Sequence, residues 1–293
     1  RVYIDGVIHT KLSSTIDSNN NTNFLTSNST FVISPLSGSQ GYFGNIDDVD
    51  IFKRELNPVE VESIYLNDTP AVVFVNLNAT GNNDGTSWTD AYNSLHDGLA
   101  NATDEVWVAD GTYNTGDVTA DSTAVFLINS AISVYGGFAG TETMLSERDL
   151  TSNQTTLSAD LLNNDITGDF DNNRADNSRH VLSVAEGISD LVTIDGFQIQ
   201  GGNTSPFADT EQYFRSGGGL NAMSRIRLGS TTFEDNYGRT GACLYLGGGA
   251  SESMITNCAF NDNLTNSQSA GIFIDSLFNV DITYCDFSNN TTV

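Results

Sequence analysis

Positive charge is scarce in this chain of 293 residues. It carries 11 Lys and Arg residues against 37 Asp and Glu, which gives a net charge of −26 at pH 7. Phosphate backbones and anionic lipid surfaces would be repelled by most of such a surface. Nucleic acid is therefore not an expected partner.

Cysteine and long apolar runs are also scarce. The three Cys residues, Cys243, Cys258 and Cys285, are too few for a disulfide-built fold and lack metal-ligand spacing, so we expect buried small side chains. No apolar run approaches the length of a bilayer span, so membrane insertion is not expected. Neither an initiator Met nor a signal peptide precedes Arg1, which favours an internal piece of a longer precursor.

Asn, Asp, Thr, Ser and Gly are abundant instead, a composition typical of all-β secreted proteins. A motif of Phe, two residues and Asn returns every 27 residues, at FEDN (233–236), FNDN (260–263) and FSNN (287–290). DGFQIQGGN looks like a worn earlier copy, with Phe197 lying 36 residues before Phe233. Small residues ahead of an apolar one alternate with these motifs, as GGGL (217–220), GACL (241–244) and SAGI (269–272).

A period in the twenties predicts a solenoid, in which each coil buries its apolar face on the next. The Phe residues of the motif would stack inside, and its Asn residues would form a ladder of amides at one corner. The pairs of small residues let the chain turn a corner against the coil above without collision. Cys258 would lie on Cys285, and because Thr231 takes the Cys position in the FEDN copy, a metal or redox site is not expected there.

These motifs resemble the polymorphic outer membrane protein repeats of secreted bacterial surface proteins. The run ATGNNDGTSWTDAYNSLHDGLANATDEVWVADGTY, with VYGGFAGTETMLSERDL after it, is similar to the N-terminal part of such β-helices in Bacteroidota-type proteins. The resemblance implies a right-handed parallel β-helix. It would occupy residues 71–293, with a capping helix near 88–102 and an acidic insertion at 139–178.

Residues 1–67 follow a different pattern. YIDG and GNIDDVDIFKREL resemble the C-terminal half of laminin-G-like, concanavalin-type jelly rolls. The predicted class is therefore all-β, a partial jelly-roll β-sandwich segment followed by a linker and first strand at 68–75 and then the solenoid. The ending NNTTV follows a repeat motif directly, so we expect more coils or a partner beyond Val293.

Two sets of residues are candidates for a site. A groove for an acidic sugar is suggested by the basic residues Arg215, Arg225, Arg227 and Arg239, although lone cations offsetting the negative charge are the simpler interpretation. Structural Ca²⁺ is suggested by the hard oxygen ligands of the acidic insertion, Asp160, Asp165, Asp169, Asp171, Asn173 and Asp176. The resemblance to jelly rolls adds Asp47 as a calcium ligand. A solvated acidic loop is the alternative to a calcium site.

Catalysis has little support from the sequence. Asp235 and Asp262 share one phase of the repeat, which favours turn residues over a hydrolase pair. His9, His96 and His180 are scattered. We expect a secreted, cell-surface attached, non-catalytic protein that serves in adhesion, glycan contact or surface display. Its partners would be glycans or other cell-surface components, or further copies or domains of the precursor. The alternatives are a polysaccharide lyase or glycoside hydrolase acting on an acidic polysaccharide, and a subunit of an extracellular filament or coat.

Overall fold

The computed structural model describes residues 2–4, 7–9, 70–116, 121–204, 216–275 and 279–293. The chain divides into two units, Arg1–Pro70 and Ala71–Val293. In the first unit, β1 (Val2–Ile4) pairs antiparallel with β2 (Val7–His9). The remaining residues of the predicted jelly-roll segment, Asp47 among them, lie outside the described residues.

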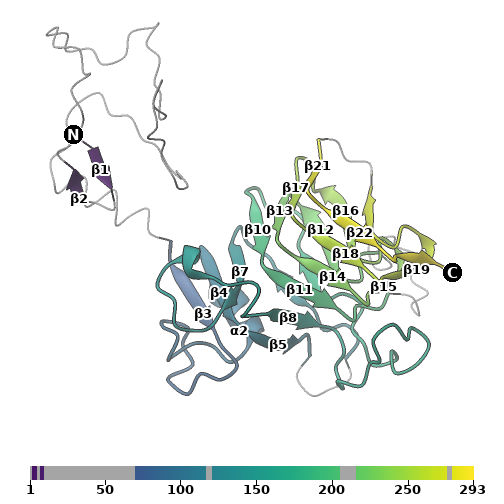
Figure 1. Cartoon of the computed structure of the whole chain (residues 1–293), viewed down its shortest axis with the longest axis horizontal. Coiled ribbons are helices and arrows are strands. Elements are labelled where there is room, and N and C mark those ends of the chain that lie inside the picture. The colour runs from purple at the N-terminus through teal and green to yellow at the C-terminus, as the bar shows by residue number, and fades with distance from the viewer. Residues whose placement is uncertain (1, 5–6, 10–69, 117–120, 205–215, 276–278) are drawn as a thin grey trace, which may run out of the picture. The chain divides into compact units, whose positions relative to one another are not determined.

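The second unit consists of four parallel sheets whose strands stack in register, the arrangement of a parallel β-helix (Figure 1). Sheet I contains seven strands in the order β21 (Asp281–Thr283), β17 (Met254–Thr256), β13 (Ile226–Gly229), β10 (Val192–Asp195), β7 (Ser133–Phe138), β4 (Glu105–Ala109) and β3 (Val72–Val75). Sheet II contains six, in the order β22 (Asp286–Ser288), β18 (Ala259–Asn261), β14 (Thr232–Glu234), β11 (Phe197–Gln200), β8 (Thr155–Ser158) and β5 (Gly111–Asn114).

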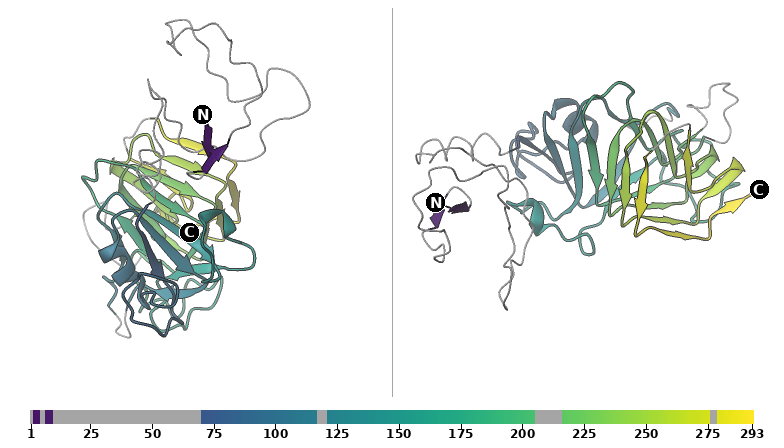
Figure 2. Two further views of the ribbon diagram at one scale, coloured as in Figure 1. Left: turned by 90° about the vertical axis from the view of Figure 1, so that its left-hand side faces the viewer. Right: turned by 90° about the horizontal axis from the view of Figure 1, so that it is seen from above.

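The two smaller sheets take strands from only some of the coils. Sheet III contains β20 (Ile272–Ile274), β16 (Leu244–Gly249), β12 (Leu220–Ser224), β9 (Leu182–Val184) and β6 (Phe126–Ile128). Sheet IV contains β15 (Tyr237–Thr240), β19 (Leu264–Gln268) and β23 (Thr291–Thr292). A second view shows the coils of this unit following one another along one axis (Figure 2).

The interior is built from columns of apolar side chains that run along the axis. In sheet I the paired positions form an aliphatic column of Val73, Val106, Val134, Ile194, Leu228, Ile255 and Ile282. In sheet II the predicted stack is confirmed. The ring of Phe260 lies 5.1 Å from that of Phe233 and 4.7 Å from that of Phe287, both nearly parallel. Each fully buried side chain of this kind stabilises the fold by roughly 1.5–3 kcal/mol.

The predicted position of the worn copy is wrong by two residues. Ile199, not Phe197, pairs with Phe233, and the amide of Gly202 lies 34 residues before Asn236, to which it donates. Phe197 is also buried, because it faces the same side of the strand two residues earlier. The alternation of apolar and polar residues therefore could not decide whether Phe197 or Ile199 is the equivalent of Phe233.

The corners of the coil repeat as strictly as the strands. Asp235, Asp262 and Asn289 all have positive φ, at 52°, 55° and 55°. Asn and Asp tolerate this conformation better than most residues. The two Asp residues are turn residues, as their phase predicted. At the opposite corner a Cβ on Gly217 would lie 2.5 Å from Leu220 O, so the small residues do permit a close turn.

The predicted capping helix is shorter than expected. α2 (Leu95–Asn101) begins after Ser94, whose hydroxyl accepts a hydrogen bond from the Asp97 amide. Residues before it form turns instead, and Tyr92 makes an isolated bridge to Val75. Leu95 and Leu99 are buried in the core, and Gly98 packs against Val75 of β3, the terminal strand of sheet I. The only other helical turn in the described residues is η1 (Leu145–Glu147).

Candidate functional site

The predicted basic groove is not gathered on one sheet. Arg225 directly precedes β13 of sheet I, and Arg227 lies within this strand and is exposed. Arg225 forms an ion pair with Glu252 at 3.3 Å, and both side chains are well exposed. Arg239 is exposed on β15 of sheet IV, after sheet II along the coil. Arg215 lies outside the described residues.

The outer face of sheet I holds a second set of side chains that sequence reasoning missed. Strand pairing places Tyr135 beside Asp195. Arg148, just after η1, forms an ion pair with Asp195 at 2.9 Å, and its guanidinium carbon lies 5.0 Å from the centre of the Tyr135 ring. We call Tyr135, Arg148 and Asp195 the sheet I triad.

The electrostatics of the triad follow from its partial burial. Burial raises the pKa of the Tyr135 hydroxyl, so the phenol stays protonated at neutral pH. The ion pair is also partly shielded, with 16% of the Arg148 and 21% of the Asp195 side chain exposed. A half-buried ring beside hydrogen-bonding charged groups can contact a hydroxylated ligand such as a sugar.

A small cavity of about 70 Å³ lies at the corner between sheets I and II. Its wall is mostly amide, hydroxyl and backbone, and includes Gln154, Gln198, Ser230 and Thr232. Gly196 also lines it, and a Cβ there would lie 3.1 Å from Arg148 Nη1. The cavity therefore borders the triad and has the size of a water molecule or two, or of one ligand hydroxyl group.

The acidic insertion is organised around one buried cation. Arg174 lies 3.6 Å from Asp165 Oδ2 and donates to the backbone oxygens of Asp169 and Asp235, at 3.2 and 2.6 Å. Its guanidinium also lies over the Phe170 ring, 4.6 Å from the centre. The like charge of this loop is therefore offset from within the chain.

Most of the predicted calcium ligands already accept hydrogen bonds. Both oxygens of Asp160 accept backbone amides, as does Oδ2 of Asp176, and Asp169 caps its own turn through Asp171 and Asn172. Asp171 and Asn173 are exposed. Within the described ranges, no three His, Cys, Asp or Glu side chains are grouped so as to hold a metal ion.

Asp165 is the member of this set that has a buried carboxylate oxygen without a hydrogen-bond partner. Its Oδ1 is buried without a hydrogen-bond partner, while Oδ2 accepts from Asn177 at 2.7 Å. Burial raises the pKa of its carboxyl to about 6. Calcium binding stays a prediction, and in this geometry it would depend on Asp165.

The histidines have structural surroundings. His180 is buried, and its Nδ1 lies 2.9 Å from Gly217 O. Burial lowers its pKa to about 4. His96 bonds Thr115 O at 2.8 Å and stacks near Phe126. His96 lies on α2 and His180 lies just before β9 of sheet III, whereas the triad lies on sheet I and just after η1.

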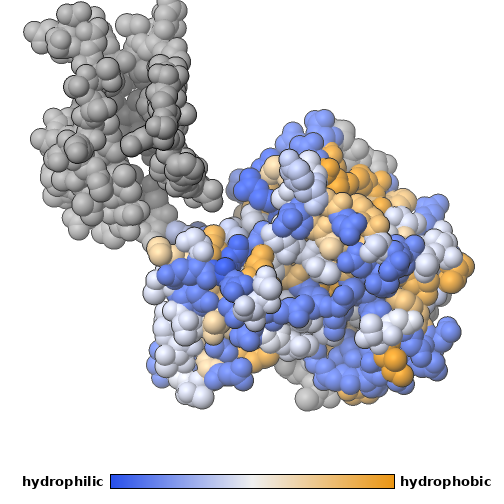
Figure 3. Space-filling view, in the orientation of Figure 1, coloured by the Kyte–Doolittle hydropathy of each residue, from blue (hydrophilic) through white to orange (hydrophobic). Residues whose placement is uncertain are grey.

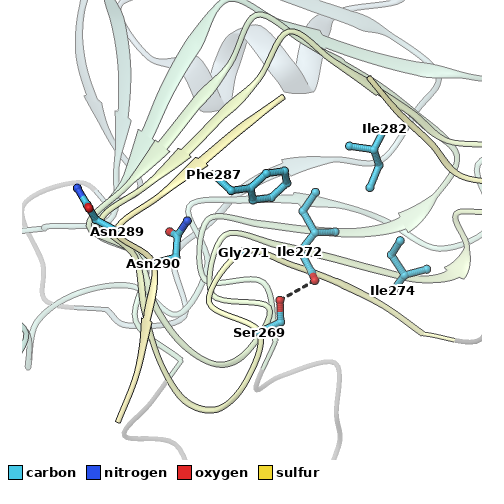
Figure 4. Close-up of a pocket in the computed structure, with 8 residues that line it drawn as sticks. All are labelled: Ser269, Gly271, Ile272, Ile274, Ile282, Phe287, Asn289 and Asn290. Atoms are coloured by element: carbon cyan, nitrogen blue, oxygen red, sulfur yellow. Dashed lines mark hydrogen bonds between the residues drawn. The ribbon is translucent and has the colours of Figure 1, made fainter. Parts of the chain in front are cut away.

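A second cavity, of about 450 Å³, lies at the C-terminal coil. Figure 4 shows the Phe287 ring pointing toward Ile272 and Ile282, while Asn289 points away. Phe287 is 49% exposed and Ile282 40%, although their equivalents in the preceding coil are buried. In the space-filling view hydrophobic surface gathers toward these coils (Figure 3). This cavity is an extension of the core columns.

The comparisons with known proteins give no family for the chain. No family model, no curated protein and no solved structure matches it. Among the described residues, no helix is long and apolar enough to cross a membrane.

Proposed function

We propose that residues 71–293 form a stiff, non-catalytic stalk of a secreted, cell-surface attached protein, serving in adhesion, glycan contact or surface display. The observation that carries this proposal is the unbroken aliphatic column of sheet I, which runs through seven paired strands. A solenoid in which every coil is packed on its neighbours resists bending, since any bend opens many contacts together. The motifs that resemble polymorphic outer membrane protein repeats agree with this role, and with a right-handed helix.

The two carboxylates considered for a hydrolase pair, Asp235 and Asp262, both lie at turn positions. Asp235 Oδ1 accepts the Gly168 amide at 2.9 Å, and its backbone oxygen accepts from Arg174. This holds the acidic loop against the coil. Asp262 repeats the same corner conformation. A hydrolase pair would instead need two carboxyl groups facing each other in different surroundings.

Glycan contact is the part of the proposal that the triad supports. The test is retention of the purified chain on immobilised glycans, with products followed by near-ultraviolet absorbance. We expect retention without unsaturated products, and weaker retention for Tyr135→Ala. Thr283→Ala is a matched control, because Thr283 lies in the same outward row four strands away. Equal retention of both variants would contradict a contact at the triad.

The lyase alternative keeps one observation in its favour. Arg225 directly precedes β13, and Arg227 lies two residues later within the strand. The Arg227 side chain is exposed on the outer face. Release of unsaturated sugars from an acidic polysaccharide, lost in both Arg225→Ala and Arg227→Ala, would replace the stalk proposal with this one. A product signal that survives both substitutions would point to a contaminating activity.

The filament alternative rests on the apolar cavity at the C-terminal coil. Head-to-tail stacking of copies would require that cavity to meet the opposite end of the solenoid, where α2 packs against β3. The helix would have to move first, so we expect single particles in electron micrographs. Ordered polymers would favour the filament.

A further inference from the structure

Cys258 and Cys285 occupy equivalent positions in adjacent coils. Each directly precedes a paired strand residue, Ala259 in β18 and Asp286 in β22. The Asp286 amide donates to Cys258 O at 2.9 Å. Because paired strands lie about 4.8 Å apart, the two Cα atoms fall within the roughly 4.4–6.8 Å that a disulfide spans.

The two thiols also point in the same direction. Cys258 Sγ donates to Thr256 O and Cys285 Sγ to Thr283 O, each 3.3 Å away and each two residues back along the chain. Each sulfur also lies near a carbonyl oxygen of the preceding coil, at 3.7 and 3.8 Å. The side chains therefore have matching rotamers, and one sulfur follows the other along the axis.

The two thiols differ in their exposure to solvent. Cys258 is buried, and burial raises the pKa of its thiol to about 12. Cys285 is partly exposed at the C-terminal coil. A reagent in solution therefore meets Cys285 first.

In contrast to the sequence expectation of small buried side chains without a redox role, we propose that Cys258 and Cys285 are a redox-active pair whose disulfide fastens the two adjacent coils. The Cys285 thiolate attacks one sulfur of a small disulfide such as oxidised glutathione, which breaks the reagent's S–S bond and expels one thiolate. The expelled thiolate takes the proton that Cys285 gave up. The Cys258 sulfur then attacks Cys285 and expels the second thiolate, which takes the Cys258 proton as the new S–S bond forms. Two protein thiols are oxidised to one disulfide, and the reagent is reduced to two thiols.

Thiol counting and intact mass on the folded chain test this pair. Incubation with oxidised glutathione should reduce the three free thiols to one and lower the mass by two hydrogens. The remaining thiol should be Cys243, which is fully buried and donates to Ala270 O at 3.1 Å. Peptide mapping should join residues 258 and 285. Three surviving thiols, or a link that includes Cys243, would overturn the proposal.

The preceding coil supplies a matched control variant. Thr231 fills the same position one coil earlier, and its hydroxyl donates to Gly229 O at 2.7 Å. Cys258→Thr should therefore fold normally and stop at the glutathione adduct on Cys285. Oxidation should slow amide hydrogen exchange at residues 281–290 by about tenfold or more in the wild type, but not in this variant. A stable adduct on wild-type Cys285, with no loss of the second thiol, would also overturn the proposal.

Discussion

Asn263 Oδ1 accepts two hydrogen bonds from Asn236, one from its backbone amide at 3.0 Å and one from its side-chain amide at 3.1 Å. Asn290 Oδ1 accepts the same two hydrogen bonds from Asn263, from its backbone amide at 3.1 Å and from its side-chain amide at 2.9 Å. The side-chain amides also donate to backbone oxygens of the preceding coil, Asn236 to Ile199 O, Asn263 to Phe233 O and Asn290 to Phe260 O. The ladder therefore satisfies the backbone amides of Asn236 and Asn263, which lie at the corner between strands.

Substitution of Asn263 by Ala should be costly because it leaves the buried backbone amide of Asn236 without its acceptor and removes the hydrogen bond that Asn263 donates to Phe233 O. We expect the free energy of unfolding, measured by urea denaturation, to fall by about 2–4 kcal/mol. Asn261→Ala is the control, since this half-buried side chain faces outward and accepts one bond from Ser288. It should change stability by less than about 1 kcal/mol. Equal losses would mean that the ladder has no special role.

The Phe stack leads to a second comparison, between an inner and an outer ring. Phe260 is fully buried between two rings, and Phe287 is 49% exposed with a ring on one side only. Phe260→Ala should lower the unfolding free energy by about 3–5 kcal/mol. Phe287→Ala should cost less than half of that in the same urea titration. A larger loss at Phe287 would contradict the burial of the two rings.

The sequence predicted the repeating features well because each is set within one coil. The Phe stack, the Asn ladder and the turn role of Asp235 all follow from a fixed phase. The triad did not follow, since the pairing of Asp195 with Tyr135 depends on how much chain the acidic insertion takes up between their strands. The predicted register of Phe197 was wrong for a similar reason. The coil that leads to Asn236 takes 34 residues, whereas the next coil takes 27.

Arg174 was not singled out among the acidic residues, yet it is the centre of the insertion. Arg174→Met keeps much of the apolar stem but leaves Asp165 without its cation. We expect a loss of about 3 kcal/mol, since removal of one partner from a buried ion pair is strongly destabilising. Limited proteolysis should cut the loop at residues 160–177 sooner. The exposed Arg227→Met is the control and should behave like the wild type.

The same experiment separates Arg174 from calcium as the organiser of the loop. If the guanidinium suffices, a chelator should leave the wild-type loop as resistant to protease as before. Chelator-induced cleavage, reversed by added Ca²⁺ and absent in Asp165→Asn, would instead support the predicted calcium site at Asp165.

His180 makes stability depend on pH in a defined window. Gly217 O can only accept, so Nδ1 carries the proton in the neutral ring, at 2.9 Å. Burial lowers the pKa of His180 from 6.5 to about 4. The folded chain therefore binds fewer protons than the unfolded chain between these values, and this contribution is complete above pH 6.5 and is lost as pH falls to 4. A shift of this size corresponds to about 3 kcal/mol.

His180→Asn isolates this contribution, because Asn can still donate to Gly217 O but does not titrate. Asp165 acts in the opposite direction: its pKa is raised to about 6, so its protonation favours the folded state as pH falls. That effect is common to both chains and cancels in their difference. The wild type should lose more stability than His180→Asn between pH 6.5 and 4, measured by urea denaturation at each pH. Parallel curves would mean that His180 titrates with an ordinary pKa, and hence that it is open to water.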